Sequence, residues 1–278
     1  MRTHHILNMG AGRQTTALYL MIADGDLNIP CDYAVFSDTQ EEESWLYDHL
    51  EWLKTQGGPP LITVTCSKLG DDLLRGENST GQKFATIPAF TSNGQGYVGQ
   101  TRRQCTSEYK IVPIEKWVRY DLIGLQPGQH MPKDVLVTHY MGFSCDEPGR
   151  AARAKMRFKQ IRWGEVEFPL MDEEIWMTEQ DCVNYCEKRV PHPVLKSACV
   201  FCPYKSNAGW LRLKKNNPDG FARAVEIDDG MRVPGRIVNR NLEAQLYLHR
   251  ACKPLKDISF DEQQGNLFDK ECEGGCGL

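Results

Sequence analysis

The first 22 residues constrain the fold most strongly. An apolar strand-like run, 6–9, is followed by a glycine-containing loop, 10–16, and then by an apolar run typical of a buried helix, 17–22. A strand, a glycine loop and a helix in this order open the α/β nucleotide-binding folds, in which backbone N–H groups of the loop and helix face an anion. The loop lacks the lysine of a Walker A loop and does not fit the dinucleotide pattern G-x-G-x-x-G. Taken alone, it fits a tight turn without a ligand equally well.

Further strand-like runs alternate with helical patterns. Strands are predicted over 32–36, 61–65 and 135–142, and a helix with one apolar face over 41–55. This alternation predicts an α/β fold with a doubly wound, mostly parallel sheet and helices on both faces. The polar segment 75–104 is predicted to be a mobile lid over the strand ends.

The change of composition near residue 168 suggests two parts. Residues 1–168 are predicted to form the α/β domain that binds an adenine nucleotide. Residues 169–278, rich in Trp, Cys and Pro, are predicted to form a smaller Cys-rich section that binds a metal or cluster and ends in a flexible tail.

Charge and composition exclude some classes of protein. The 278 residues include 33 Lys and Arg against 37 Asp and Glu, a net charge of −4, which argues against a general DNA-coating protein. No run approaches the ~18 apolar residues of a membrane helix, so no membrane partner is expected. The chain enters its first strand at once, so we expect no signal peptide and a cytoplasmic location. In a reducing compartment the eleven cysteines favour metal or redox chemistry over disulfides.

The sharpest local signal is the pair Cys199 and Cys202, which Pro203 follows. Two thiolates at this spacing can hold one metal ion or one edge of an iron–sulfur cluster. A set made only of cysteines suits zinc as well as iron–sulfur clusters. The candidates for further ligands are Cys105, Cys252, Cys272 and Cys276. The other cysteines are expected to be buried small hydrophobic residues: Cys31, Cys66, Cys145, Cys182 and Cys186.

Polar residues follow several predicted strands, where doubly wound sheets bind ligands. Asp38 and Thr39 follow the second strand, although from the residues alone we favour a role as N-cap of the next helix. Arg102 and Arg103 suit bidentate binding of phosphate or sulfate, with a solvated basic turn as the alternative. The charged segment 146–150 suits a ribose, a metal or the cluster region, or is a surface charge cluster.

The order of these segments resembles the adenine nucleotide α-hydrolase-like (PP-loop) superfamily, most closely its phosphoadenosine phosphosulfate (PAPS) reductase-like branch. Residues 10–18 look like the modified PP-loop of that branch, which often carries Gln where the ATP-using enzymes have Lys-Asp. Residues 36–39 look like its Asp-Thr-Gly turn, with Gln40 in place of the glycine. Residues 105–114 are similar to its Cys-Cys-x-x-x-Lys-x-x-Pro-Leu box, with Thr106 in place of the second cysteine.

The resemblance continues to the end of the chain. Residues 142–150 resemble the element Gly-x-Arg-x-x-Glu-x-x-x-Arg, and 168–181 resemble Pro-Leu…Trp-Thr-x-x-Asp. Residues 270–278 resemble the tail Lys-x-Glu-Cys-Gly-Leu-His, but they hold two cysteines and lack the His. The matches span most of the chain, and their shared order is more specific than any one of them.

The resemblance implies an enzyme that reduces a sulfonucleotide. A tail thiolate, Cys276 or Cys272, would attack the sulfate sulfur, and a thiol carrier such as thioredoxin would reduce the product. A [4Fe-4S] cluster, with zinc as the alternative metal, would lie on Cys105, Cys199 and Cys202, with Cys272 completing the set. The residues expected to bind the adenosine nucleotide are Gly10, Gly12, Arg13, Gln14, Thr15, Thr16, Asp38, Thr39, Arg102, Arg103, Gly142, Glu147 and Arg150.

Two alternatives remain. In the second hypothesis the chain is a transferase that cleaves ATP to AMP and pyrophosphate in order to adenylate and thiolate tRNA or DNA. The missing Lys-Asp argues against this activity, whereas the two tail cysteines favour it mildly. In the third hypothesis the chain is a non-catalytic nucleotide-binding module with structural zinc.

Overall fold

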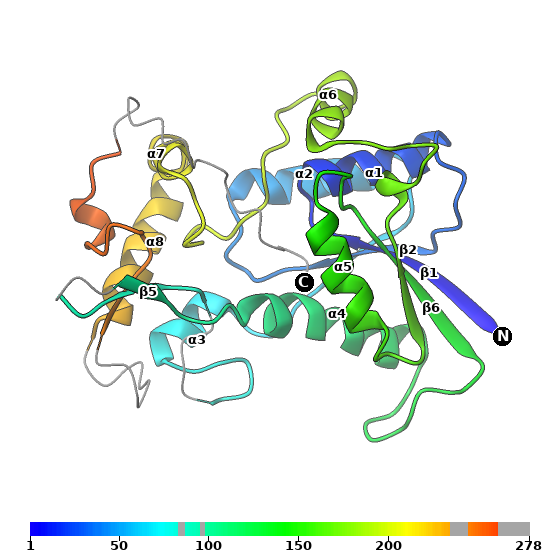
Figure 1. Ribbon diagram of the computed structural model, residues 1–278, viewed down its shortest axis with the longest axis horizontal. Coiled ribbons are helices and arrows are strands. Elements are labelled where there is room, and N and C mark those ends of the chain that lie inside the picture. Colours follow the sequence, from blue (N-terminus) through cyan, green and yellow to red (C-terminus); the bar gives the residue numbers. More distant parts are fainter. Residues whose placement is uncertain (83–86, 95–97, 234–243, 261–278) are drawn as a thin grey trace.

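The fold is organised around a five-stranded parallel sheet of order β3-β2-β1-β6-β7 (Figure 1). The computed structural model describes residues 1–82, 87–94, 98–233 and 244–260. The strands of this sheet are β1 (Arg2–Met9), β2 (Tyr33–Ser37), β3 (Leu61–Val64), β6 (Val135–Met141) and β7 (Gly164–Glu167). The sequence-based prediction of an α/β fold with a parallel sheet is confirmed.

Helices cover both faces of this sheet. Alternate residues of β1 show why: Leu7 is buried against helices α1 (Arg13–Asp24) and α2 (Ser44–Lys54), whereas Ile6 is buried in a second core on the opposite face. That second core includes α4 (Val112–Trp117), which lies between two π-helical turns, η1 (Ser107–Ile111) and η2 (Val118–Leu122). Helix α5 (Pro148–Phe158) packs beside β7, and α6 (Glu179–Arg189) packs on α1.

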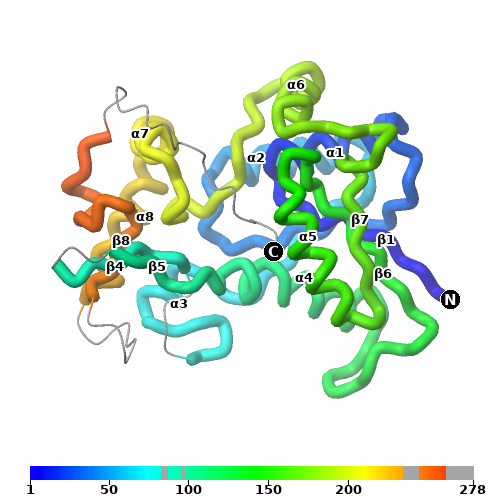
Figure 2. Tube along the Cα trace, viewed as in Figure 1, coloured from blue at the N-terminus to red at the C-terminus, as the bar shows by residue number. Residues whose placement is uncertain are grey.

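The described residues after 190 form a second group of elements with a segment from the first half of the chain. Helices α7 (Asn207–Asn216) and α8 (Pro218–Met231) share a buried core with α3 (Leu69–Arg75). A small antiparallel sheet of order β5-β4-β8 lies beside α8 (Figure 2). Its strands are β4 (Phe90–Ser92), β5 (Val98–Gln100) and β8 (Gln245–Tyr247).

This small sheet corrects one sequence-based prediction. The segment 75–104 was expected to be a lid over the strand ends, but its described part contains β4 and β5, and β4 pairs with β8. The partner strand lies far along the chain, so the polar composition of the segment gave no sign of the pairing. Residues 83–86 and 95–97 of this segment lie outside the described part.

Residues beyond 168 contribute to the buried cores on both sides of the molecule. Leu170, Cys182 and Cys186 lie in the core between α1 and the sheet, and Trp210 lies in the core with α3. Within the described ranges, no helix combines the length and the apolar character that crossing a membrane requires.

Candidate functional site

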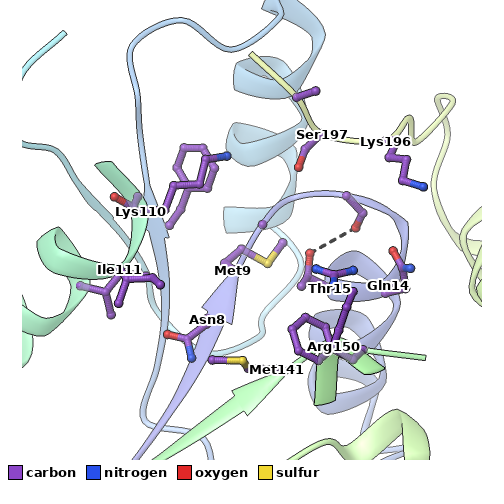
Figure 3. Close-up of a pocket in the computed structure, with 18 of the residues that line it drawn as sticks. Asn8, Met9, Gln14, Thr15, Lys110, Ile111, Met141, Arg150, Lys196 and Ser197 are labelled. Carbon is purple, nitrogen blue, oxygen red and sulfur yellow. Dashed lines mark hydrogen bonds between the residues drawn. The ribbon is translucent and has the colours of Figure 1, made fainter. Parts of the chain in front are cut away.

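A cavity lies at the carboxyl ends of β1, β2 and β6 (Figure 3). The order of the sheet reverses between β1 and β6, and parallel α/β sheets bind their ligands outside such a switch point. The loop after β1 lines the cavity with Gly10 and Gly12, and the first turn of α1 lines it with Gln14 and Thr15. Gly142 lines it from the loop after β6.

The loop after β6 approaches the first turn of α1 very closely. A Cβ atom on Gly142 would lie 2.8 Å from Thr15 Cγ2 and 3.0 Å from Thr15 Cα, so only glycine fits there. Helix α1 begins at Arg13 with Gly12 as its N-cap, and no side chain caps its first turn. Its first N–H groups are therefore available to an anion, which the helix dipole also favours.

The lining of the cavity is rich in basic side chains. Of the residues that line it, Glu115 is the acidic one, and it pairs with Arg157. The basic lining residues are Lys110, Arg150, Arg157, Lys196, Lys205 and Arg212. Each of these six side chains also pairs with a carboxylate, but of those carboxylates only Glu115 lines the cavity. The lining itself therefore presents more basic than acidic side chains, which suits an anionic ligand such as a nucleotide.

Two buried carboxylates hold three of these cations in place. Lys110 Nζ lies 3.2 Å from Glu42 Oε1, and the Glu42 side chain is fully buried. Lys205 pairs with Glu43, and both side chains are at least nine-tenths buried. Arg212 Nη2 lies 3.6 Å from the same Glu43 oxygen. These pairs fix the ammonium groups before any ligand enters, which reduces the entropy cost of binding.

The opposite side of the cavity is mostly apolar. Its lining side chains include Ile111, Ile114, Met141 and Phe158, with the polar pair Asn8 and His139. Burial and the nearby guanidinium of Arg157 lower the pKa of His139 to about 3, so its imidazole is neutral at physiological pH. A charged group can therefore lie at one side of the cavity while an uncharged ring lies at the other.

The structure brings about half of the predicted nucleotide-binding residues to this cavity. The residues that line it are Gly10, Gly12, Gln14, Thr15, Gly142 and Arg150. Glu147 is not among the lining residues, but it accepts a hydrogen bond from Gln14 at 3.2 Å and pairs with Arg150. The Arg150 guanidinium also lies 4.2 Å from the centroid of the Phe143 ring.

The other predicted residues lie elsewhere. Arg13 pairs with Glu179, and the hydroxyl of Thr16 lies 2.9 Å from Nε2 of His49, away from the cavity. Arg103 lies over the ring of Tyr204. Neither Arg102 nor Arg103 is among the residues that line the cavity, and the same holds for Asp38 and Thr39.

The interpretation of Asp38 or Thr39 as a helix N-cap is wrong. Helix α2 begins at Ser44, with Glu43 in the N-cap position. The helix predicted from residue 41 is therefore three residues shorter at its start. Glu41–Glu43 are each 5% exposed, and Arg223, Lys110 and Lys205 pair with them, which holds this segment outside the helix.

The cysteine pair lies in one turn beside the cavity. The backbone N–H of Cys202 donates to the carbonyl of Cys199 at 3.0 Å, and Cys202 lines the cavity. The thiol of Cys199 lies 3.2 Å from the Thr39 hydroxyl, and burial beside Glu42 raises its pKa well above the usual value. Cys105 packs at the edge of the core formed by α3, α7 and α8.

Among the described residues, no group of three or more His, Cys, Asp or Glu side chains is placed to hold a metal ion. Cys272 and Cys276 lie outside the described residues. The described cysteines do not by themselves form the four-cysteine set of a [4Fe-4S] cluster.

The remaining cysteines agree with expectation in part. Cys182 and Cys186 are buried, and burial raises the pKa of each thiol to about 12, as expected for inert core residues. Cys66 is exposed, so its predicted burial is wrong, and Cys31 and Cys145 are half-buried. Cys252 lies near the small sheet, its thiol 3.9 Å from the carbonyl oxygen of Thr91.

Sequence reasoning assigned no role to most of the basic wall. Lys110 falls inside the box 105–114, and Lys196 and Lys205 flank the cysteine pair, so each lay beside a recognised signal. Arg212 and Arg157 lie on helices without any motif. Asn8 and His139 were part of strands predicted for their apolar character alone.

Comparison with known proteins gives no relative. No protein-family model, no curated protein and no solved structure matches the chain. The fold and the site define an α/β protein whose sheet order is consistent with a Rossmann-like fold, with a cationic cavity at its switch point.

Proposed function

We propose that the chain is an enzyme that acts on an adenosine nucleotide, of the sulfonucleotide (PAPS) reductase type. The observation that carries this proposal is the cavity between the loops after β1 and β6. It joins an uncapped helix N-terminus and a cationic wall, both suited to phosphate and sulfate, to an apolar side suited to a base. The resemblance of residues 10–18 and 105–114 to the reductase motifs supports the reaction type.

In the proposed reaction a tail thiolate, Cys276 or Cys272, attacks the sulfur of the nucleotide's phosphosulfate. A sulfur–sulfur bond forms and the S–O bond to the phosphate breaks, so the nucleotide leaves with the electron pair. A second thiol, from the tail or from a carrier such as thioredoxin, then attacks the cysteine sulfur, releases sulfite and leaves a disulfide. Lys110, Lys196 and Arg212 would stabilise the charge on the departing phosphate.

The metal prediction needs its own measurement. Iron, acid-labile sulfide and zinc are determined in protein purified without oxygen. About four iron and four sulfide per chain supports the cluster and excludes a purely structural zinc site. Stoichiometric zinc without sulfide contradicts the cluster and favours the non-catalytic module.

Nucleotide binding is tested first. We expect Lys196→Gln to weaken the binding of 3′-phosphoadenosine 5′-phosphate about tenfold in calorimetric titration, because it removes a charge-assisted contact. The matched control is Lys188→Gln on α6, an exposed lysine that does not line the cavity, which should leave the affinity unchanged. Equal affinities of the two variants would contradict the assignment of the cavity.

Turnover is tested next, by sulfite release from phosphoadenosine phosphosulfate with dithiothreitol. The wild-type chain should release sulfite, and at least one of Cys276→Ser and Cys272→Ser should abolish the release. Full activity in both variants would remove the tail from the reaction.

The large number of cations also favours a second candidate, an ATP-cleaving enzyme that thiolates tRNA or DNA. A triphosphate carries more charge than a phosphosulfate, and the wall from Lys196 to Arg212 offers the positive charge to match it. Release of pyrophosphate from ATP, with and without tRNA or DNA, separates the two. Pyrophosphate without sulfite would replace the reductase proposal with this one.

A further inference from the structure

Two polar side chains meet on the otherwise apolar side of the cavity. Asn8, near the end of β1, and His139, on β6, both line the cavity from neighbouring parallel strands. The amide nitrogen of Asn8 lies 3.2 Å from Nδ1 of His139, and its oxygen lies 3.4 Å from the same atom. Both polar atoms of the amide therefore lie close to Nδ1, and the nitrogen is the nearer of the two.

The position of the proton on the His139 ring decides the direction of that hydrogen bond. Phe158 covers the ring, with the two centroids 4.8 Å apart, and the ring is neutral. A neutral imidazole carries one proton, so Nδ1 either accepts or donates. We assign Asn8 as the donor and Nδ1 as the acceptor because the amide nitrogen is the nearer of the two Asn8 atoms. The ring proton then lies on Nε2, which is buried and has no hydrogen-bond partner among the described residues.

The amide oxygen of Asn8 then faces the cavity as an acceptor. Figure 3 shows the Asn8 amide between Met141 and Ile111, with its oxygen on the Ile111 side. Both neighbours are apolar and line the cavity, so a flat ring that enters between them would bring its polar edge to this oxygen.

We propose that Asn8 determines base specificity, by accepting a hydrogen bond from the exocyclic amino group of adenine, and that His139 is the positioning residue that keeps the amide turned. The inference rests on the proposed nucleotide site and names the edge of the base that Asn8 contacts. A 6-oxo purine presents an oxygen where adenine presents the amino group. Two acceptors would then face each other, and such an unpaired polar contact weakens binding strongly.

The test compares AMP with IMP, which differ at ring position 6 and carry the same phosphate. We expect wild-type protein to bind AMP at least tenfold more tightly than IMP. Asn8→Ala should bring the two affinities within about twofold. Asn184→Ala, an exposed asparagine on α6, is the matched control and should keep the full preference.

His139 is tested with two variants. His139→Phe keeps a ring of similar size but offers no acceptor, so the amide is free to turn and the preference should fall to about threefold or less. His139→Gln offers a side-chain oxygen and should restore part of the preference. A role in stability alone would lower the thermal midpoint of both variants without changing the ratio of the two affinities.

Each outcome decides the inference. If wild-type protein binds AMP and IMP equally, prefers IMP, or keeps its preference in Asn8→Ala, the inference is overturned while the nucleotide site stands. If neither AMP nor IMP binds and adenosine polyphosphates do not bind either, the proposed function fails and the inference fails with it.

Discussion

Gly142 shows how one residue shapes the site. The end of β6 approaches the first turn of α1 so closely that a Cβ atom at this position would lie 3.0 Å from both the backbone nitrogen and Cα of Thr15. Backbone atoms cannot move aside as a flexible side chain can. Any side chain at 142 must therefore separate the loop after β6 from the first turn of α1.

We expect Gly142→Ala to lower the free energy of unfolding by about 1–3 kcal/mol, as overpacking does, and to weaken AMP binding at least tenfold. Urea denaturation and calorimetric titration measure the two effects. Gly149→Ala is the matched control, because a Cβ there would meet only Arg153 Nη1 at 3.6 Å. Gly149 lies in α5, so alanine should leave binding unchanged and raise stability by about 0.5–1 kcal/mol. Similar losses in both variants would contradict the steric argument.

The segment between β2 and α2 connects elements from three parts of the chain. Glu41 pairs with Arg223 of α8, Glu42 with Lys110 of η1, and Glu43 with Lys205 just before α7. Buried ion pairs of this kind contribute little net stability over apolar packing, but the loss of one partner leaves a buried charge uncompensated. The segment therefore fixes the positions of the cations around the cavity.

We expect Glu43→Ala to lower the free energy of unfolding by about 3–5 kcal/mol, because Lys205 would keep a buried charge without its partner. Glu51→Ala is the control, since its pair with Lys54 on α2 is exposed and contributes less than about 1 kcal/mol. Urea denaturation of both variants gives the comparison. A loss no larger for Glu43→Ala than for Glu51→Ala would show that solvent reaches the Lys205 ammonium.

Sequence patterns predicted the elements whose own residues determine their secondary structure. The strands β1, β2, β3 and β6 and the helix α1 were predicted because each carries an apolar or periodic run. Strands β4, β5 and β8 are three residues long, and β4 and β8 depend on partners far along the chain. Strand β7 has the sequence Gly-Glu-Val-Glu, which contains no apolar run. Glutamate favours helices, so 41–43 looked helical until distant cations were known to pair with these residues.

The residues of the site also divide into those that local patterns predict and those that only the folded chain brings together. The glycine loop and Arg150 were predictable because ligands bind at the carboxyl ends of parallel strands. Lys196, Lys205 and Arg212 reach the cavity only through the folding of residues 191–216 over the sheet, which no local pattern records. The bond between Asn8 and His139 depends on strand register, which the sequence alone did not provide.

Three histidines lie buried in different parts of the molecule. Burial lowers the pKa of His49 and of His249 to about 4, and that of His139 to about 3. The unfolded chain, with pKa values near 6.5, binds more protons than the folded chain below that pH. Stability is therefore greatest above pH 6.5 and falls as the pH drops toward 4.

We expect each of these histidines to contribute a slope of at most about 1.4 kcal/mol per pH unit between about pH 4.5 and 6. Urea denaturation at several pH values measures the total slope. His49→Gln should make the slope shallower by one histidine's share, whereas His130→Gln, at an exposed site, should not change it. An unchanged slope in His49→Gln would show that His49 is already protonated in the folded protein.

The pairing of β4 with β8 places Thr91 opposite Leu246. On the ribosome, the partner of β4 is made only when most of the chain has already emerged. Until then Leu69, Leu73 and Ala89 have no complete core to enter, because Trp210, Ile227 and Leu248 are still to come. The parallel sheet, whose strands end at residue 167, can form earlier. The part of the molecule around α3 therefore exposes apolar side chains until late in synthesis, when the parallel sheet can already have formed. A prematurely terminated chain would be prone to aggregate.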